Sequence, residues 1–350
     1  MSSFQDNLNN TGDTTTIMSS VTPPTTSDEP ESLELPPPGT CEIHTSTTTT
    51  LTTTTMTQMH FTLTYFRFGG SAEAIRCAFH MGHIDFEDFR ISHREFQTER
   101  DAGALPYGQL PVLDVTTTTK ITTTPNHNHH HNNKHAGTTN GHISNEDNEI
   151  SKEESSARTI RLPQSTAILR FVGKLAKLYP EDALTALRCD ALIDAVQDFN
   201  EKLRPTIKPY VSELNEDERL KVRWELGTFT IPLWLRRVAF QLDEEGPFAL
   251  GAHICVCDLA LFVVFKWLGM GLLDGIPMDL VQQHERLIVF MDAVQHEPRV
   301  ASFYDDEIVK LEEAAALEAK TAKAVQANLK PSRGASPLQQ QQLQQANGGS

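Results

Sequence analysis

The pattern of hydrophobic and polar positions starts at about residue 60 with a period of two. Apolar residues alternate with threonine there, which is typical of a half-buried β-strand. Gly69-Gly70 ends the alternation, and beyond it apolar residues recur at helical spacing as far as Gly82, a plausible helix end. A second short strand is expected at about 86–92, so the order predicts a parallel βαβ unit with a right-handed crossover. The residues that carry these patterns are Phe61, Leu63 and Tyr65 for the strand and Ala72, Ile75 and Phe79 for the helix.

A third strand is expected from Gln109 to Val115, opened by Pro111. Residues 116–157 are then rich in Thr, Asn and His without periodicity, and a short strand returns at about 158–162. We interpret this stretch as a low-complexity insert at the tip of a β-hairpin, because loop-closure entropy grows only slowly with loop length.

After Gln164 every pattern is helical, and residues 258–270 are apolar nearly all round, as expected of a central helix. Pro232 is expected to bend the helix that contains it. The stripes are Ile168, Phe171, Leu175 and Leu178; Leu187, Ala191, Val196, Phe199 and Leu203; Leu220, Trp224, Gly227, Ile231, Leu235, Val238 and Leu242; and Leu280, Leu287, Phe290 and Val294.

The predicted organisation is an α/β domain followed by an all-α domain. The α/β domain covers residues 59–180 with the insert at 116–157, and the helical domain covers residues 181–305. Residues 1–58 are rich in Thr, Ser, Asn and Pro and are expected to be disordered. Residues 306–350 are expected to be weakly helical and then disordered.

Composition excludes several classes of function. A net charge of −16 argues against nucleic acid or an anionic membrane as the main partner. No secretory signal is visible, and the most apolar run is too short to span a bilayer. We therefore expect a cytoplasmic, reducing environment.

Cysteine and histidine usage leaves two minor alternatives open. The cysteines, at 41, 77, 189, 255 and 257, are few and include no C-x-x-C. Cys255 and Cys257 form a C-x-C, for which ordinary buried thiols are favoured over a metal or redox role. The tract from Asn126 to His131 could bind transition metals weakly, but a polar low-complexity tract is the favoured interpretation, and no metal is expected.

Three pieces of sequence carry candidate chemistry. Tyr65 stands at the carboxyl end of the first strand, where open sheets bind ligands, and its phenol could donate to a thiolate; the alternative is a core aromatic. The peptide before Pro111 could be cis, with Leu110 free to pair with an extended peptide, or Pro111 could simply open the strand. Ser165 is a favoured N-cap, and a helix N-terminus attracts carboxylates, which Gln164 could also hold.

Together these pieces resemble the glutathione S-transferase family, and specifically its tyrosine-type, sigma-like members. The resemblance lies in TLTYF…GGSAEAIR, PYGQLPVLDV and LPQSTAILRFVGKLAKLYP, within residues 61–115 and 158–304. It implies a thioredoxin-like N-terminal domain, an all-α C-terminal domain and a homodimer.

The resemblance also implies roles for residues. Tyr65 would stabilise the glutathione thiolate, and Asp258 would be a buried helix-capping acid, in a capping box weakened by Cys255. Ser71 replaces an expected Arg, so Ser71 is an alternative thiol activator, and Phe96 replaces a Trp whose indole would donate a hydrogen bond. The residues expected to bind glutathione are Phe66, Phe96, Arg100, Gln109, Leu110, Pro111, Gln164, Ser165 and Asp190, the last reaching the neighbouring subunit's glutathione.

The expected function is glutathione transfer to small hydrophobic electrophiles, as in detoxification, with glutathione as cosubstrate. Two alternatives stay open. One is a glutathione-dependent isomerase, as some sigma-like relatives are. The other is a non-catalytic protein of the same fold that binds glutathione or hydrophobic molecules.

Overall fold

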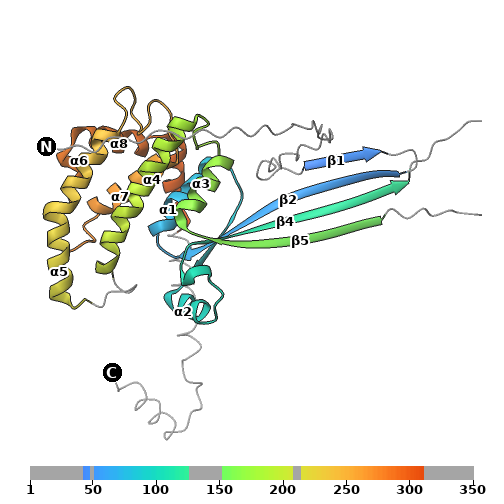
Figure 1. Cartoon of the computed structure of the whole chain (residues 1–350), viewed down its shortest axis with the longest axis horizontal. Coiled ribbons are helices and arrows are strands. Elements are labelled where there is room, and N and C mark those ends of the chain that lie inside the picture. Colours follow the sequence, from blue (N-terminus) through green and yellow to red (C-terminus); the bar gives the residue numbers. More distant parts are fainter. Residues whose placement is uncertain (1–41, 48–50, 126–151, 208–213, 311–350) are drawn as a thin grey trace, which may run out of the picture. The chain divides into compact units, whose positions relative to one another are not determined.

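The computed structural model describes residues 42–47, 51–125, 152–207 and 214–310 (Figure 1). Its sheet begins with a βαβ unit. Strand β2 (Leu51–Phe66) pairs in parallel with β3 (Glu87–Ile91), and helix α1 (Glu73–Met81) connects them. Ala72, Ile75 and Phe79 are fully buried, and Gly82 caps α1. The predicted βαβ unit is confirmed.

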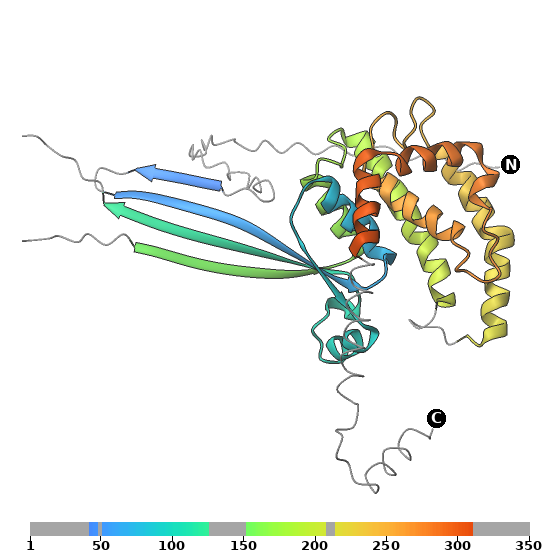
Figure 2. The same cartoon turned by 180° about the vertical axis from the view of Figure 1, so that it is seen from behind.

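The rest of the sheet is antiparallel. Strand β4 (Val112–Pro125) pairs with β2 on one side and with β5 (Lys152–Pro163) on the other. Helix α2 (His93–Asp101) precedes β4, and α3 (Ser165–Leu175) follows β5. Both views show α1 and α3 together on one side of the strands and α2 on the other (Figures 1 and 2). The β4–β5 ladder confirms the predicted hairpin, and the His-containing tract 126–131 lies outside the described residues.

Two low-complexity regions are more ordered than expected. Residues 51–59, 116–125 and 152–157 belong to long strands, and β1 (Glu42–Thr47) pairs with the distal part of β2. The prediction of disorder through residue 58 and of an unstructured insert from 116 is therefore wrong for these residues. Threonine is β-branched, and the two Thr-rich runs lie in register, from Thr62↔Asp114 out to Leu51↔Pro125. Each extended chain supplies hydrogen-bonding partners for the other.

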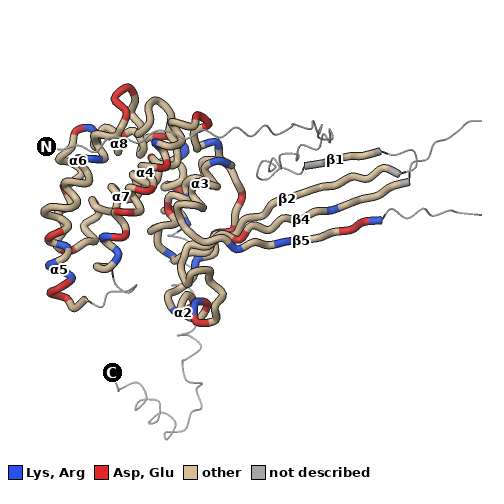
Figure 3. Tube along the Cα trace, viewed as in Figure 1, with Lys and Arg blue, Asp and Glu red and all other residues tan. Residues whose placement is uncertain are grey.

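These distal strand residues form what we call the threonine ribbon, namely residues 51–58, 116–125 and 152–161. Among its described side chains none is buried. The charges of the ribbon lie mainly on β5, at the edge of the sheet, whereas residues 51–58 have none (Figure 3). Charged side chains on an edge strand discourage pairing with further chains.

The helical part is built around α7 (Val256–Gly269), which is buried on nearly all sides, as predicted. It packs with α4 (Ala183–Leu203) and α8 (Glu285–Gln295), and Leu287, Phe290 and Val294 are fully buried. The other helices are α5 (Glu216–Glu225) and α6 (Ile231–Gln241). Short 3-10 turns cover Gly70–Ala72, Pro106–Gly108, Arg204–Thr206 and Val281–Gln283, and residues 298–310 are also helical.

One predicted stripe has the wrong phase before residue 226. Leu220 and Trp224 are exposed, whereas Arg219 and Arg223 on the same helix are buried. A π-helical segment, Leu226–Thr230, separates α5 from α6. It precedes Pro232, which lacks the N–H needed for an ordinary helical bond. The additional residue in a π turn rotates the preceding helix by about 100°, so the stripe extrapolated from α6 lands on the outer face of α5.

The start of α4 shows a similar error. Leu187 and Ala191 are exposed, and the buried face instead begins with Cys189, Leu192 and Ile193. From Val196 onward the predicted stripe is buried. Among the described helices, none has the length and apolar character required to cross a membrane.

We expect the threonine ribbon to be dispensable for folding. A variant lacking residues 1–57, with residues 118–157 replaced by an Asn-Gly turn, should keep its thermal unfolding midpoint within about 4 °C of the parent, because no described side chain that it removes is buried. Differential scanning calorimetry measures this. A loss of cooperative unfolding would show that the ribbon is part of the folding unit.

Candidate functional site

The sheet brings the three sequence pieces to one edge. The last β2–β4 pair is Thr64↔Val112 and the last β4–β5 pair is Val112↔Pro163. The register continued by one residue aligns Tyr65, Pro111 and Gln164 across neighbouring chains, at a spacing of about 4.8 Å per strand. Segments far apart in the sequence therefore meet where β2 ends.

The Tyr65 hydroxyl is held by the turn that follows β2. The backbone N–H of Ser71 donates to the phenolic oxygen at 3.2 Å. Burial raises the pKa of Tyr65, and the bonds from Ser71 and the charge of Arg76 only partly oppose this. Tyr65 is therefore protonated at neutral pH, and its oxygen accepts from the backbone of the turn while the phenol retains a hydrogen that it can donate.

Gly70 makes this arrangement possible. Its φ is +47°, in the left-handed region, and a Cβ at this position would lie 2.6 Å from the Tyr65 hydroxyl oxygen. Any other residue would be strained and would displace the phenol. The glycine is required at the turn because the backbone approaches the tyrosine closely.

Arg76 provides the positive charge nearest to Tyr65. Its guanidinium lies 5.8 Å from the centroid of the Tyr65 ring. It is buried, pairs with Asp88 on β3 at 2.9 Å, and donates to the carbonyls of Phe66 and Phe68 at 3.1 Å. Arg76 thus supplies positive charge near the turn in which Ser71 stands at the position of the expected Arg, and no sequence pattern indicated this role.

Phe66 and Phe96 form an aromatic cluster together with Phe68 and His93. Phe96 is 9% exposed and meets Phe66 edge to face at 5.3 Å between centroids. The Arg100 guanidinium lies 5.7 Å from the Phe96 centroid and pairs with Asp101 at 3.1 Å. The structure therefore brings three of the predicted binding residues together around an apolar surface.

The residues that lead into β4 and α3 have the predicted conformation, except at the N-cap of α3. The Leu110–Pro111 peptide is cis, and Leu110 lies just before the first ladder residue of β4. Gln109 is exposed. The N-cap of α3 is Gln164, with φ of +79°, so Ser165 is the first helical residue and not the predicted cap. Because Gln164, with its positive φ, is the N-cap, α3 begins one residue earlier than predicted. The N–H of Ser165 therefore belongs to the helix N-terminus.

Asp190 is engaged within the chain. Its carboxylate accepts from Arg170 at 2.5 Å and from the Tyr179 hydroxyl at 2.9 Å. Burial and this bond to Asp190 raise the pKa of Tyr179 to about 12. Arg170 also pairs with Asp194 at 2.6 Å. Asp190 therefore lies in a network between α3 and α4, and sequence patterns gave no signal for either partner.

Asp258 occupies the third residue of α7 and is fully buried. It accepts from the backbone N–H of Ala249 at 2.6 Å and of Cys255 at 2.7 Å, and the Cys255 thiol donates to it at 3.2 Å. The capping box is present despite the cysteine. Burial raises the pKa of Asp258 to about 6, against the opposing effect of the two backbone bonds.

A second network joins the two parts of the fold and had no sequence signal, because its members are far apart in the chain. Glu73 on α1 accepts from Lys266 on α7 at 2.8 Å and from the Tyr304 hydroxyl at 2.7 Å. The Lys266 ammonium lies 3.8 Å from the Tyr304 ring centroid. Figure 2 shows the helical segment that carries Tyr304 next to α1. These contacts hold the turn of Tyr65 against the helical domain.

Comparison with known proteins agrees with this architecture. A family model described as glutathione S-transferase, C-terminal domain, matches residues 194–307. Glutathione S-transferase 1 of Ascaris suum is 25% identical, over 69% of this chain and 93% of the relative. Glutathione S-transferase 3 of Caenorhabditis elegans is 24% identical, over 58% and 77%, and human hematopoietic prostaglandin D synthase is 24% identical, over 70% and 94%.

Solved structures give the same result for the fold. Prostaglandin synthase D of Nilaparvata lugens aligns with a TM-score of 0.50 and 21% identity, over 70% of this chain and 97% of that one. The structure of NaGST1 aligns with a TM-score of 0.51 and 17% identity, over 71% and 97%. The chain has the glutathione S-transferase fold, with a thioredoxin-like domain and a helical C-terminal domain. The family model and these relatives thus point to glutathione S-transferases as the proteins that this chain is similar to.

Replacement of Asp258 by Ala should reduce the free energy of unfolding at pH 7 by about 2–4 kcal/mol, because the buried N–H groups of Ala249 and Cys255 lose their acceptor. Urea unfolding measures the loss. Asp198→Ala, on the exposed side of α4, is the control and should change stability by less than about 0.5 kcal/mol. Equal effects of both substitutions would contradict the capping role.

The parent and Asp258→Ala should also differ in how their stability depends on pH. The folded-state pKa of Asp258 is raised from 3.8 to about 6, so the folded protein binds the extra proton between these values. The contribution of Asp258 to the free energy of unfolding is then fully present below pH 3.8 and falls as the pH rises through 6. The stability difference between the parent and Asp258→Ala should be larger at pH 5 than at pH 7.5. A pH-independent difference would assign the cost to the lost packing alone.

Proposed function

We propose that this protein is a glutathione transferase in which Tyr65 stabilises the thiolate of glutathione for attack on a hydrophobic electrophile. The observation that carries the proposal is the orientation of the Tyr65 hydroxyl. The backbone N–H of Ser71 donates to its oxygen at 3.2 Å and fixes the phenol, which can then donate its own hydrogen to a substrate acceptor. A phenol that donates to a thiolate forms a charge-assisted bond and lowers the pKa of the thiol.

The chemistry that follows is nucleophilic substitution. The thiolate is the reactive form of glutathione, and populating it at neutral pH is the catalytic gain. A new C–S bond forms at the electrophilic carbon, and the leaving group departs with the electron pair of the bond that breaks. The positive charge of Arg76 near Tyr65 favours the anionic thiolate as well.

The neighbouring chain ends fit the rest of the tripeptide. Leu110 lies outside the β-ladders, so its backbone can pair with the cysteinyl residue of glutathione. The N-terminus of α3, with Gln164 and Ser165, suits the γ-glutamyl carboxylate. Gln109 and Pro111 flank Leu110. Phe66, Phe96 and Arg100 form the side assigned to the glycyl end, where Arg100 can supply charge but Phe96 offers no hydrogen-bond donor.

Tyr65 is favoured over Ser71 as the thiol activator. The backbone N–H of Ser71 donates to the Tyr65 oxygen. Ser71 is thus a positioning residue in this proposal, and it acts through its backbone.

The finer assignment is a sigma-like, homodimeric enzyme of the cytoplasm that acts in detoxification. The four described cysteines are free, which suits a reducing compartment. A glutathione-dependent isomerase is the second candidate, because prostaglandin D synthases of man and mouse are among the relatives. In the dimer, Asp190 would accept a bond from the partner's glutathione in addition to those from Arg170 and Tyr179, since each carboxylate oxygen can accept more than one. A protein that only binds glutathione or hydrophobic molecules is the remaining alternative.

Tyr65→Phe should raise the pKa of the thiol of bound glutathione by about one to two units. The reason is that a hydrogen bond to a charged group, here the thiolate, contributes about 1.5–3 kcal/mol. The pH profile of kcat/KM for a generic aryl halide measures this pKa. At pH 6.5 the rate should fall roughly 10- to 100-fold, while binding to immobilised glutathione is retained.

Ser71→Ala is the matched variant. It keeps the backbone N–H that bonds to Tyr65, so its rate should fall less than about 5-fold. An unchanged profile for Tyr65→Phe together with a large loss for Ser71→Ala would transfer the role to Ser71. Binding of glutathione by the parent without turnover of the aryl halide or of a prostaglandin endoperoxide would favour the non-catalytic alternative.

A further inference from the structure

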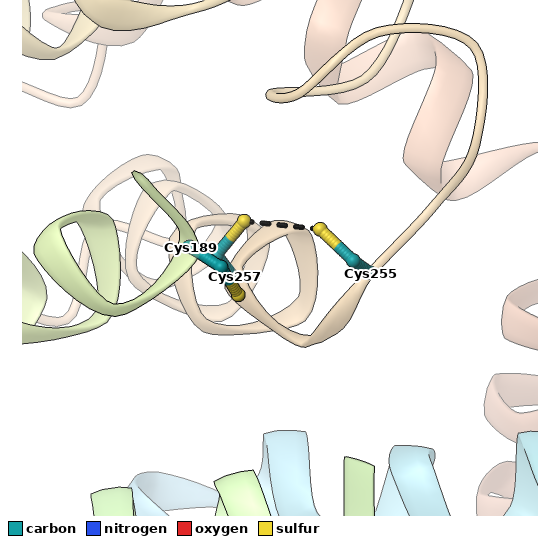
Figure 4. Close-up of side chains that lie close together, drawn as sticks. All are labelled: Cys189, Cys255 and Cys257. Carbon is teal, nitrogen blue, oxygen red and sulfur yellow. Dashed lines mark hydrogen bonds between the residues drawn. The ribbon is translucent and has the colours of Figure 1, made fainter. Parts of the chain in front are cut away.

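Three cysteine side chains converge at the start of α7. Cys255 is the N-cap of this helix, Cys257 lies in its first turn, and Cys189 comes from α4 (Figure 4). Their sulfur atoms all lie within 4.8 Å of one another, and those of Cys255 and Cys257 are 3.2 Å apart. All three are buried, so the cluster is shielded from water.

The donor set is suited to a soft metal ion. Thiolates select soft or borderline ions such as Cu(I) and zinc over calcium and magnesium. A structural zinc site takes four ligands in tetrahedral geometry, whereas this cluster has three sulfurs. The carboxylate oxygens of Asp258 already accept from the N–H groups of Ala249 and Cys255. The site therefore fits an ion that is satisfied by sulfur alone and by fewer than four ligands.

We propose that Cys189, Cys255 and Cys257 bind one Cu(I) ion. The ion would join α4 to the N-terminus of α7. In a site with two thiolates and one thiol, two protons leave as the ion enters, and the bound unit has a net charge of −1. No electron transfer is involved, because copper enters and stays as Cu(I).

The location makes a negative charge acceptable. The cluster stands at the N-terminus of a helix of 14 residues, whose dipole favours anions. Copper binding here is independent of glutathione chemistry at Tyr65, so the two proposals fail separately.

Cys77 provides the matched control. It is also buried, at 2% exposure, but it lies on α1 and is outside the cluster. All variants keep the same histidine tract, so copper held by that tract is common to all of them and cancels in the comparison.

The test is a Cu(I) titration of the reduced full-length protein without oxygen, in competition with bathocuproine disulfonate. The key variant is Cys255→Ser. Serine is a favoured N-cap and keeps the capping box, so this variant should fold at least as well as the parent. Cys189→Ala is the second variant, and Cys77→Ser is the control.

The parent and Cys77→Ser should each retain one Cu(I) against the chelator, whereas Cys255→Ser and Cys189→Ala should retain at least 10-fold less at the same free Cu(I). X-ray absorption of the copper-loaded parent should show sulfur neighbours that are lost in Cys189→Ala. Retention by Cys255→Ser equal to that of the parent would overturn the proposal. So would a preference for zinc over Cu(I), or copper in the parent without sulfur neighbours. Failure of the reduced protein to bind, with a Cys255–Cys257 disulfide formed in air, would replace it with a thiol redox pair.

Discussion

The buried guanidinium of Arg76 determines the geometry of the turn on which the proposed chemistry depends. One side chain joins the carbonyls of Phe66 and Phe68 to the carboxylate of Asp88. It thereby links the end of β2, the turn and β3. An arginine suits this position because its fixed fork of donors matches several oxygens at once. A buried charge of this kind is tolerated because it is paired with a carboxylate and hydrogen-bonded to backbone carbonyls. The same charge lies near the Tyr65 ring, so the interaction that closes the turn also affects the electrostatics of the proposed site.

The N-terminus of α7 is a second centre of organisation, and it combines structure with the proposed chemistry. Asp258 satisfies backbone donors at Ala249 and Cys255 and so ties the loop before α7 to the helix. The cysteine at the N-cap costs little here, because the backbone half of the box is intact. It also adds a thiol to the two contributed by Cys189 and Cys257. A serine in place of Cys255 would serve the cap equally well and would remove the third sulfur of the proposed copper site.

The threonine ribbon is the part of the chain that differs most from a plain two-domain arrangement. Its strands are held by backbone hydrogen bonds along a continuous register rather than by burial of side chains. The ladder grows directly out of the same β2, β4 and β5 that end at Tyr65, Pro111 and Gln164. The ribbon and the candidate site therefore lie at opposite ends of the same strands, which allows one to vary without displacing the other.

The sequence alone determined most of the helices and strands and the three segments that supply the proposed site. Alternating and helical spacing predicted the βαβ unit, the hairpin and the buried α7, because burial imposes those periods on a chain. It misassigned the Thr-rich strands, since pairing between distant low-complexity runs leaves no apolar pattern. It also misplaced Leu220 and Trp224, because one extra residue in the π segment shifts the phase of the preceding helix. Only the tertiary structure decided that Arg76 lies beside Tyr65, that Ser71 donates to its hydroxyl, and that Cys189 joins Cys255 and Cys257. Such contacts join residues through packing and side-chain direction, and neither of these is written in the spacing of residues along the chain.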